Sequence, residues 1–347
     1  MENAAQHFDK LKQAHLPAIL ALIEEVIGTA SPRGSAVAAM CRYHLETGGK
    51  RLRALLPLLV AEALERDPAP LVPFGAACEM LHNATLVHDD LQDGDEMRRG
   101  RASVWRRFGS AQAINLGDAM YYYAVLLVQR LDLPAEAREA ATRRLLLETL
   151  RVIEGQEQEL ALRTVERPSL DAYFAMVEGK TSGLFALPMA GAAEICGAEP
   201  EIVGALGEAA GHLGVLFQIQ DDVLDLYGDK GRGERGSDVG EGKRSALVVH
   251  ALGHADEEQA CWLRQVLDAP RQDTTSDDVD AVAALFERTG SLRFVLDEIA
   301  RRAQRAAGVA TFAGRPRLQA LCAGLCELCL KPIAPLVAAK RGGRVGD

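Results

Sequence analysis

The sequence predicts an all-α fold, arranged as a single-domain helical bundle around a central cavity. Hydrophobic residues make up 48% of the 347-residue chain and aromatic residues only 5%, while alanine and leucine abound. Apolar residues recur with helical periodicity along nearly the whole chain, and no alternating strand pattern of useful length interrupts them. We therefore expect one domain over residues 1–347, with a core from about 10 to 335 and a disordered tail over 336–347.

Glycine, proline and aspartate separate the predicted helices, as at Gly48-Gly49, Asp67-Pro68, Arg167-Pro168 and Asp268-Ala269-Pro270. In chain order, the periodic segments predict helices at His15–Ile27, Arg53–Leu64, Gly75–Val87, Ile114–Leu131, Glu136–Leu162, Leu170–Val177, Leu184–Cys196, Ile202–Leu226, Ala246–Leu252, Glu257–Leu267, Val279–Arg288, Ser291–Ala307 and Leu318–Leu328.

The composition and the first residues of the chain argue against nucleic-acid-binding, membrane-spanning and secreted proteins. The net charge of -10 argues against a general nucleic-acid binder. No apolar run reaches the roughly 18 residues of a membrane span, because the best candidate, near residues 52–64, contains Pro57 and Glu62. The first residues lack the basic and apolar stretches of a secretory signal. The seven cysteines form no disulfide pattern, so we expect reduced thiols and a cytoplasmic location.

Two acidic clusters share one pattern, Asp-Asp-x-x-Asp, at residues 89–93 and 221–225, and each follows a mostly apolar run. On a helix, the first and last Asp of each cluster lie one turn apart on one face. Carboxylates gathered in apolar surroundings need compensation, and Mg²⁺ supplies it while sharing its ligand shell with phosphate. One such cluster is usually a solvated helix face. Two of them, each in an otherwise apolar helix, indicate a cavity where metal ions hold a diphosphate.

Basic and polar residues surround these clusters. In Gly48-Gly49-Lys50-Arg51-Leu52-Arg53, Lys50 and Arg53 lie three residues apart, so both side chains can converge on one phosphate at a helix N-terminus. The alternative is a basic surface turn, and the segment is not a P-loop. Met97-Arg98-Arg99-Gly100-Arg101 follows the first cluster, where arginines either pair with carboxylates or bind phosphate. His82 lies two turns before Asp89, where a purely structural histidine is the alternative.

Further along the chain, Lys180-Thr181 lies at a helix end, and Gln218 precedes Asp221 by three residues. Lys243 follows a segment dense in glycine and charge, 228–242, which is either a flexible linker or a closing lid. Cys322, Cys326 and Cys329 match an iron–sulfur spacing. They form the buried stripe of a predicted amphipathic helix, however, so we expect core packing and no cluster.

Together, these motifs resemble the trans-isoprenyl diphosphate synthases (polyprenyl synthetase family) over roughly residues 47–247. The resemblance implies an isoprenoid synthase-like all-α catalytic domain, a homodimer, and a Mg²⁺-dependent prenyltransferase. Asp89, Asp93 and Asp221, with Asp90, Asp222 and Asp225 nearby, would ligate three Mg²⁺. The residues that would hold isopentenyl diphosphate are Lys50, Arg53, His82 and Arg99. The residues that would contact the allylic diphosphate are Arg98, Lys180, Thr181, Gln218 and Lys243.

The chain departs from the family pattern in three places. Ala54 replaces a usual proline, and Ala102 interrupts a usual Arg-Gly-Lys-Pro run. The predicted lid is about two residues short, so the family's phosphate-contacting lysine has no clear match; Lys230, Arg232 and Arg235 are the candidates.

The chemistry implied is a head-to-tail condensation. Metal ions and cations make the allylic diphosphate a leaving group, and the alkene of isopentenyl diphosphate attacks the allylic carbocation. Thr85, Ala84 and Leu81 precede Asp89 by one and two turns. A small residue at Ala84 favours a geranylgeranyl (C20) product, with C15 or longer products as alternatives, and Tyr121-Tyr122-Tyr123 would close the tunnel lower down.

Three rival classes remain. A class I terpene cyclase usually has a different second metal motif and would give Lys50, Arg53 and Arg99 no purpose. A non-catalytic partner subunit would be expected to lose acidic residues, and both clusters are complete. A purely structural helical scaffold has no reason to place carboxylates on apolar faces.

Overall fold

A computed structural model describes residues 4–228 and 235–342 of the chain, and the all-α prediction is confirmed. Within these ranges the only strands are the two-residue β1 (Met97–Arg98) and β2 (Arg101–Ala102), which pair as an antiparallel hairpin. The helices are α1 (Ala4–Ala30), α2 (Ala36–Leu45), α3 (Leu52–Ala63), η1 (Ala69–Leu71), α4 (Val72–Gln92), α5 (Val104–Phe108), α6 (Ser110–Val128), α7 (Ala135–Leu162), α8 (Leu170–Lys180), α9 (Gly183–Ile195), α10 (Pro200–Tyr227), α11 (Ser237–Gly240), α12 (Ala246–His254), α13 (Glu257–Asp268), η2 (Arg271–Asp273), α14 (Ser276–Arg288), α15 (Ser291–Ala307), η3 (Ala310–Phe312), α16 (Pro316–Leu330), η4 (Lys331–Ile333) and α17 (Ala334–Gly342).

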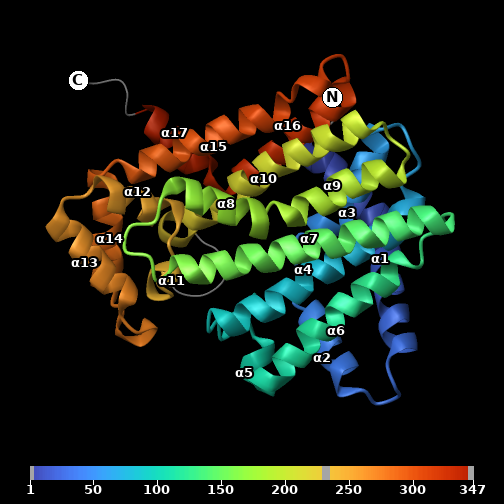
Figure 1. Cartoon of the computed structure of the whole chain (residues 1–347), viewed down its shortest axis with the longest axis horizontal. Coiled ribbons are helices and arrows are strands. Elements are labelled where there is room, and N and C mark those ends of the chain that lie inside the picture. Colours follow the sequence, from blue (N-terminus) through green and yellow to red (C-terminus); the bar gives the residue numbers. More distant parts are fainter. Residues whose placement is uncertain (1–3, 229–234, 343–347) are drawn as a thin grey trace.

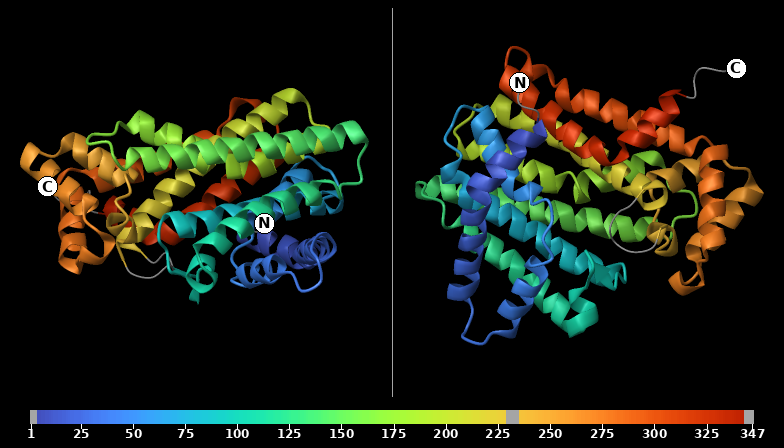
Figure 2. Two further views of the ribbon diagram at one scale, coloured as in Figure 1. Left: turned by 60° about the horizontal axis from the view of Figure 1, so that its bottom comes forward. Right: turned by 180° about the vertical axis from the view of Figure 1, so that it is seen from behind.

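The long helices run roughly side by side, with α4, α7, α8, α9 and α10 along the length of the molecule (Figure 1). Helix α4 packs against α3 and α6, α10 against α9 and α15, and α7 against α8 and α9. The smaller helices α12 to α14 cover one end of this bundle, and α1 crosses behind it (Figure 2). The bundle therefore surrounds a space whose walls come from helices distant in sequence.

Helix α10 shows why the second acidic cluster lies inside the bundle. It begins at Pro200, a favoured first helical residue, and continues for 28 residues. Leu213, Leu216 and Ile219 are completely buried, which fixes the rotation of the helix about its axis. Because the acidic cluster continues the same helix, it cannot turn towards solvent without exposing these residues.

Helix α4 fixes the first cluster in the same way. Phe74, Met80 and Val87 are fully buried, and Asp89 comes half a turn after Val87. Helix α3 crosses α4 very closely: a Cβ atom on Gly75 would lie 2.3 Å from the carbonyl oxygen of Ala54. This glycine sets the separation of α3 and α4.

The structure differs from the predicted elements in short helices and at the chain end. Helices α2, α5 and α11 are missing from the prediction because each has few periodic turns; Ser35 nevertheless caps α2, its Oγ accepting from Ala38 N at 3.2 Å. The predicted disordered tail is wrong over 336–342. Helix α17 continues there because Leu336 and Val337 pack against the core.

Two helical stretches, Pro200–Tyr227 and Pro316–Ala338, are long and apolar enough to cross a membrane by composition alone. The sequence prediction, which counted uninterrupted apolar runs, did not find them. More than half of the apolar window in Pro200–Tyr227 is buried in the bundle, whereas most of the window in Pro316–Ala338 is not. Core helices of soluble proteins satisfy the same criterion, so neither stretch supports a membrane assignment.

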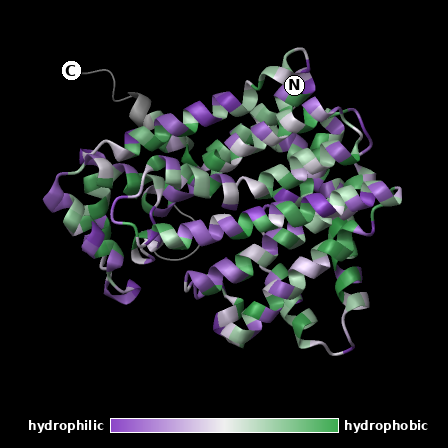
Figure 3. Cartoon of the chain, in the orientation of Figure 1, coloured by the Kyte–Doolittle hydropathy of each residue, from purple (hydrophilic) through white to green (hydrophobic). Residues whose placement is uncertain are grey.

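All seven cysteines are free, and Cys322, Cys326 and Cys329 are buried, which confirms the core-packing prediction for this stripe. Hydrophobic and hydrophilic residues alternate along the surface helices, and α7 has both kinds on the viewer's side (Figure 3).

Replacing Gly75 by alanine should destabilise the fold, because the added methyl group forces α3 and α4 apart. We expect the free energy of unfolding to fall by about 1–3 kcal/mol, measured by urea denaturation. Gly204 is the matched control: it also lies inside a helix, but a Cβ atom there meets no heavy atom within 4 Å. Gly204→Ala should be neutral or stabilise the protein by up to about 1 kcal/mol. Equal losses for both variants would contradict the close crossing.

Candidate active site

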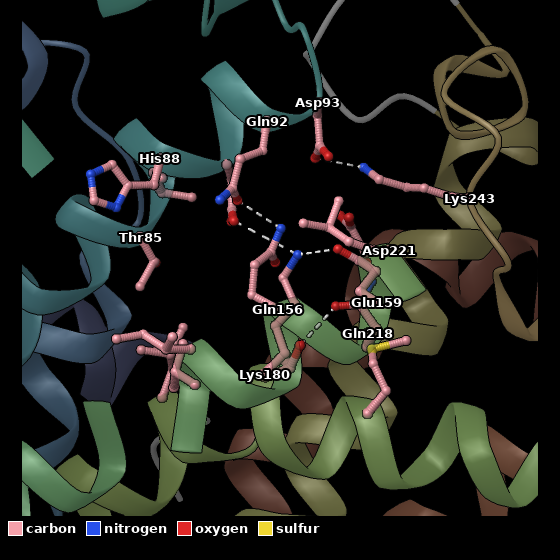
Figure 4. Close-up of a pocket in the computed structure, with 18 of the residues that line it drawn as sticks. Thr85, His88, Gln92, Asp93, Gln156, Glu159, Lys180, Gln218, Asp221 and Lys243 are labelled. Atoms are coloured by element: carbon pink, nitrogen blue, oxygen red, sulfur yellow. Dashed lines mark hydrogen bonds and ion pairs between the residues drawn. The ribbon is translucent and has the colours of Figure 1, made fainter. Parts of the chain in front are cut away.

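One cavity of about 490 Å³ lies inside the bundle, within the 300–1,000 Å³ range of ligand pockets. Its walls come from α3, α4, α6, α7, α8, α9 and α10 and from the turn that follows α11. Figure 4 shows the side chains around it. Charged and polar residues form one part of the lining: Asp89, Asp93, Glu159, Lys180, Gln218, Asp221, Asp222 and Lys243. We call this part the polar end. The other part, which we call the apolar end, includes Thr85, Tyr121, Val152, Ile153 and Leu184.

Both acidic clusters line this cavity, as the sequence predicts: Asp89 and Asp93 from α4, Asp221 and Asp222 from α10. In the described part of the chain, no group of three or more His, Cys, Asp or Glu side chains is already close enough to hold a metal ion. Instead, basic side chains lie between the carboxylates.

The aspartates within each cluster are not equivalent. Asp90 is only 1% exposed, and the Nε of Arg98 donates to both of its carboxylate oxygens at 2.7 Å. Asp225 is buried too, and accepts from Ser237 Oγ at 2.7 Å and Asp238 N at 3.1 Å. Neither aspartate lines the cavity. The sequence predicts Asp90 and Asp225 as metal ligands; in the structure both carboxylates are bonded to protein groups outside the cavity lining, because helical rotation directs them away from the cavity.

Asp222 lines the cavity but is largely occupied by protein partners. Its carboxylate accepts from the hydroxyl of Tyr173 at 2.8 Å, from Gln218 Nε2 at 3.0 Å and from Ala246 N at 3.0 Å. The last of these bonds gives an acceptor to the backbone N–H of Ala246, which has no partner within the first turn of α12. Asp89, Asp93 and Asp221 are therefore the three carboxylates of the two clusters best placed for a ligand in the cavity.

Lysines neutralise the carboxylates at the polar end. Lys180 Nζ lies 2.5 Å from Glu159 Oε2 and 3.7 Å from Asp89 Oδ1, and Lys243 Nζ lies 3.0 Å from Asp93 Oδ2 (Figure 4). Burial raises the pKa of Asp89, and the neighbouring Asp93 and Glu159 add to this effect against the opposing Lys180. Burial also opposes ionisation of Asp93, but Lys243, Lys180 and Arg163 outweigh it and lower the pKa of Asp93.

Helix α7 supplies two site residues, Gln156 and Glu159, that sequence reasoning missed. Gln156 Nε2 donates to Gln92 Oε1 at 2.9 Å, and Glu159 accepts from Lys180. Gly155 allows this arrangement, because a Cβ atom there would lie 2.1 Å from the backbone nitrogen of Lys180. The sequence contained one signal of this close contact, namely a single glycine in the middle of a strongly helical segment.

A second cationic group lies beside the acidic clusters. Arg53 and His82 line the cavity, and the guanidinium of Arg53 stacks over Phe185 and Phe217 with centroid distances of 4.7 and 4.8 Å. Arg53 Nε and His82 Nδ1 are buried without a hydrogen-bond partner. Burial, followed by Arg53 and Arg99, lowers the pKa of His82. A guanidinium and a neutral imidazole that both have a nitrogen without a partner are suited to hydrogen-bond an anion.

Lys50 and Arg99, also predicted here, are exposed and do not line the cavity. Arg99 Nη1 donates to the carbonyl of Gly48, and a Cβ atom on Gly49 would collide with the Arg99 guanidinium. The structure therefore brings Arg99 to the glycine turn, at the edge of the site. Lys50 lies in that same turn.

A buried ion pair supports the turn from behind. Arg51 has a left-handed backbone, with φ of 58°, and its Nη1 donates to Glu79 Oε1 at 2.9 Å. The other carboxylate oxygen of Glu79 accepts from Ala54 N at 3.2 Å and so satisfies a free N–H at the start of α3. Glu79 thereby fixes the helix end that carries Arg53.

The apolar end requires one correction. Ala84 and Leu81, predicted as tunnel residues, are buried in the core and do not line the cavity, whereas Thr85 does. Each residue turns an α-helix by about 100°, so Ala84 faces the packed interior of the bundle. Of the predicted tyrosines only Tyr121 lines the cavity; Tyr122 is 72% exposed, and Tyr123 is buried against Ser31, with 2.6 Å between their hydroxyl oxygens.

The remaining predicted contacts are Thr181 and Gln218, which line the cavity, and the lid candidates. Thr181 Oγ1 donates to Gln218 Oε1 at 2.8 Å, which joins α8 to α10. Of the three lid candidates, Lys230 and Arg232 lie outside the described residues. Arg235 Nε donates to the Leu226 carbonyl at 2.6 Å, and its guanidinium pairs with Asp280, away from the cavity.

Arg271, in the η2 turn, links three separate segments beside the first acidic cluster. Its guanidinium donates to Asp95 Oδ1 at 3.1 Å and to the carbonyl of Asp93 at 3.2 Å, and lies 3.4 Å from Glu241. Glu241 also pairs with Lys243 at 2.5 Å, although burial raises the pKa of Glu241 to about 8. These contacts position Lys243 and Asp93 from outside the cavity.

An all-α bundle with an internal cavity, charged at one end and apolar at the other, defines a class of proteins that hold amphiphilic anions. Comparison with known proteins identifies the family within this class. The family described as Polyprenyl synthetase matches residues 35–286. A short chain isoprenyl diphosphate synthase of Methanocaldococcus jannaschii is 34% identical over 251 residues, which is 72% of this chain and 76% of that protein.

A geranylgeranyl pyrophosphate synthase of Geoglobus acetivorans is 36% identical over 231 residues, covering 66% of this chain and 72% of that protein. A polyprenyl synthase structure from Caulobacter crescentus, complexed with calcium and isoprenyl diphosphate, superposes with a TM-score of 0.82 at 25% identity, covering 93% of this chain and 96% of that one. The chain belongs to the polyprenyl synthetase family, as its motifs suggested, and is an enzyme of that family.

Arg271→Gln should loosen the segment around Asp95. Trp105 Nε1 donates to the carbonyl of Asp95 at 2.8 Å, so Trp105 fluorescence reports on this segment. In a Trp262→Phe background we expect red-shifted Trp105 emission and a loss of about 1 kcal/mol in unfolding free energy, as for a partly exposed ion pair. Arg264→Gln, which removes a 3.3 Å pair with Glu257, is the control and should leave the emission unchanged. Unchanged emission in Arg271→Gln would refute the link.

Proposed function

We propose that this enzyme condenses isopentenyl diphosphate head to tail with an allylic diphosphate to form geranylgeranyl (C20) diphosphate. The observation that carries the proposal is one cavity that is lined by aspartates of both acidic clusters, by the buried guanidinium of Arg53, by the imidazole of His82, and by apolar side chains. Such a cavity suits two diphosphates and a hydrocarbon chain. The family membership supports the same reaction class.

Asp89, Asp93 and Asp221 are the proposed ligands of Mg²⁺, with three ions per active site. The fit rests on the donor set, because the carboxylates of Asp89, Asp93 and Asp221 line one cavity and carboxylate oxygens are ligands that Mg²⁺ prefers. When bound, Mg²⁺ would supply charge neutralisation of the diphosphate leaving group. Glu159 and Asp222 would then act as supports of Lys180 and Gln218.

The chain's own residues do the rest. Lys180 and Lys243 would exchange their present carboxylate partners for phosphate oxygens of the allylic substrate, with Arg98 kept in place by Asp90. Arg53 and His82, with Lys50 and Arg99 at the rim, would bind the diphosphate of isopentenyl diphosphate. This arrangement directs the two substrates towards each other across the cavity.

The allylic carbocation needs shielding from water and from nucleophiles. The hydroxyl of Thr181 donates to the side-chain carbonyl of Gln218, so both groups are held in fixed positions near the acidic clusters. Their oxygen dipoles would stabilise developing positive charge. The leaving diphosphate is the proposed acceptor of the final proton.

Product length is assigned to the apolar end. Thr85 and Tyr121 line it, and Thr85 is the smaller of the two, so it leaves room for chain growth past α4. We favour a C20 product, with C15 or longer products as alternatives.

The enzyme is further proposed to be a homodimer that acts in the cytoplasm. Exposed large hydrophobic side chains on α6 and α7, among them Tyr122, Leu126, Leu147 and Leu150, favour an interface between two chains.

Incubation of the protein with isopentenyl diphosphate, each C5 to C15 allylic primer and Mg²⁺ tests the reaction. Asp89→Asn, Asp93→Asn and Asp221→Asn should each lower kcat by about 10²–10³-fold, because each removes charge that stabilises the leaving group. Asp277→Asn, on the exposed first turn of α14, is the control. Cyclised products from an allylic diphosphate alone would favour a terpene cyclase. The absence of turnover with any primer would favour a non-catalytic partner subunit.

Thr85→Phe should shorten the product, because the ring enters the apolar end of the cavity. Ala84→Phe, one residue earlier, should instead destabilise the protein by about 1–3 kcal/mol through overpacking, with a smaller change in product length. Chromatographic sizing of dephosphorylated products and thermal unfolding distinguish the two effects. If only Ala84→Phe shortened the product, the tunnel would have to lie along the face of α4 that carries Ala84.

A further inference from the structure

Helix α7 ends beside the first acidic cluster, and its last residues act differently on Asp89 and Asp93. Glu159 and Arg163 are four residues apart, so they lie on the same side of the helix axis, one turn from each other. Glu159 pairs with Lys180, whereas Arg163, the C-cap residue of α7, pairs with Asp93. One turn of α7 therefore supplies both an anion and a cation to the surroundings of the two aspartates.

Asp93 has a cation at each carboxylate oxygen. Arg163 Nη2 donates to Oδ1 at 2.6 Å, and Lys243 Nζ lies 3.0 Å from Oδ2. Figure 4 shows Asp93 and Lys243 facing each other. The side chain of Asp93 is only 6% exposed and that of Arg163 19%, so solvent ions screen this pair weakly. A divalent cation that takes Asp93 as a ligand must therefore compete with charges of the protein itself.

Asp89 is in the opposite situation. Lys180 Nζ lies 3.7 Å from Asp89 Oδ1 but 2.5 Å from Glu159 Oε2, so Glu159 draws the lysine away from the aspartate. Within the part of the chain that the structure describes, Lys180 is the only side chain that forms an ion pair with Asp89. The side chain of Asp89 is also more exposed than that of Asp93. The two aspartates of one cluster therefore differ in how readily they can accept a new cation.

The position of Asp93 on its helix explains why it needs a second cation. Asp93 is the C-cap residue of α4, where a negative charge is unfavourable because the helix dipole has its negative end there. Lys243 lines the cavity, so a diphosphate in the cavity can take it over. Arg163 does not line the cavity and approaches the carboxylate from outside. A ligand in the cavity can therefore replace Lys243 but leaves Arg163 on Asp93.

We propose that Arg163 sets the divalent-cation affinity of the first acidic cluster, because it competes for Asp93 and repels a second positive charge at that carboxylate. Arg163 is a positioning residue in this role, since it acts through Asp93 from outside the cavity. It keeps the cluster in a weakly binding form until a diphosphate adds its own negative charge. The inference deepens the proposed function, because it takes Asp89 and Asp93 as metal ligands.

A purely structural role for Arg163 predicts a different result. If Arg163 only tethered the end of α7 to the end of α4, its loss would loosen these helix ends and weaken the binding of any ligand between them. Competition for Asp93 predicts the opposite sign for a divalent cation, because removal of the guanidinium leaves a carboxylate oxygen without its cation. The direction of the change in metal affinity therefore distinguishes the two roles.

Titration with Mn²⁺, followed by the electron paramagnetic resonance signal of the free ion, measures this affinity without any substrate. Arg163→Gln should bind Mn²⁺ about tenfold more tightly than the unaltered protein, which is the size of effect that residues around metal ligands have. Arg163→Lys keeps the charge and should bind Mn²⁺ as the unaltered protein does. Arg167→Gln, which removes an exposed pair with Glu257, is the matched control and should change nothing. An unchanged or weaker affinity in Arg163→Gln would overturn the proposal.

Asp93→Asn locates the effect. In this background Arg163→Gln should no longer change the Mn²⁺ affinity, because the contested carboxylate is gone; an undiminished gain would show that Arg163 acts elsewhere. Thermal unfolding without Mn²⁺ reports whether each variant is folded. Arg163→Met, which has an apolar stem of similar length and no charge, should show the same gain and serves if Arg163→Gln does not fold.

The consequence for catalysis is a change in the metal requirement. With isopentenyl diphosphate and an allylic primer, Arg163→Gln should reach its half-maximal rate at a lower Mg²⁺ concentration than the unaltered protein. If the unaltered protein makes no prenyl product while Arg163→Gln still binds Mn²⁺ more tightly, the reaction assignment fails and the role of Arg163 stands. If prenyl product forms with the same Mg²⁺ requirement and the same Mn²⁺ affinity in both proteins, the reaction stands and the role of Arg163 fails.

Discussion

The structure depends on the confinement of several carboxylates inside an apolar helical bundle. Asp89, Asp93 and Asp221 project into one cavity because the apolar faces of α4 and α10 leave their helices no other rotation. Like charges at such a distance from bulk water require partners. Lys180 and Lys243 provide them, and in the proposed reaction the same lysines would contact the diphosphate of the allylic substrate.

The residues around this charged centre are arranged in layers. Glu159 holds Lys180, Asp222 holds Gln218, and Asp90 holds Arg98. Further out, Arg271 and Glu79 fix the segments that carry the cavity residues. Asp90 and Asp222 are each the second aspartate of an Asp-Asp-x-x-Asp cluster, yet their surroundings differ: Asp222 lines the cavity, whereas Asp90 orients the neighbouring Arg98. Such support matters, because catalysis by electrostatic stabilisation requires fixed groups.

Polar and apolar ends of the cavity answer different chemical needs. In the proposed reaction, the polar end would hold the departing diphosphate, and the apolar residues would keep water away from the carbocation. Helix α7, which supplies Glu159 to the polar end, also lines the cavity with Val152 and Ile153. In the proposed reaction, helix α7 would thus serve both leaving-group binding and product growth.

Local pattern in the sequence was sufficient for the long helices of the bundle, the two acidic clusters and the family resemblance. Helical periodicity is a property of neighbouring residues, and Asp-Asp-x-x-Asp within an apolar helix signals its chemistry without tertiary context. Contacts between distant segments decided the rest. Only the structure shows that Asp90 pairs with Arg98, that Ala84 faces the core while Thr85 faces the cavity, and that Glu159 meets Lys180. Those facts depend on how each helix is rotated against its neighbours, which the packing of the whole bundle fixes.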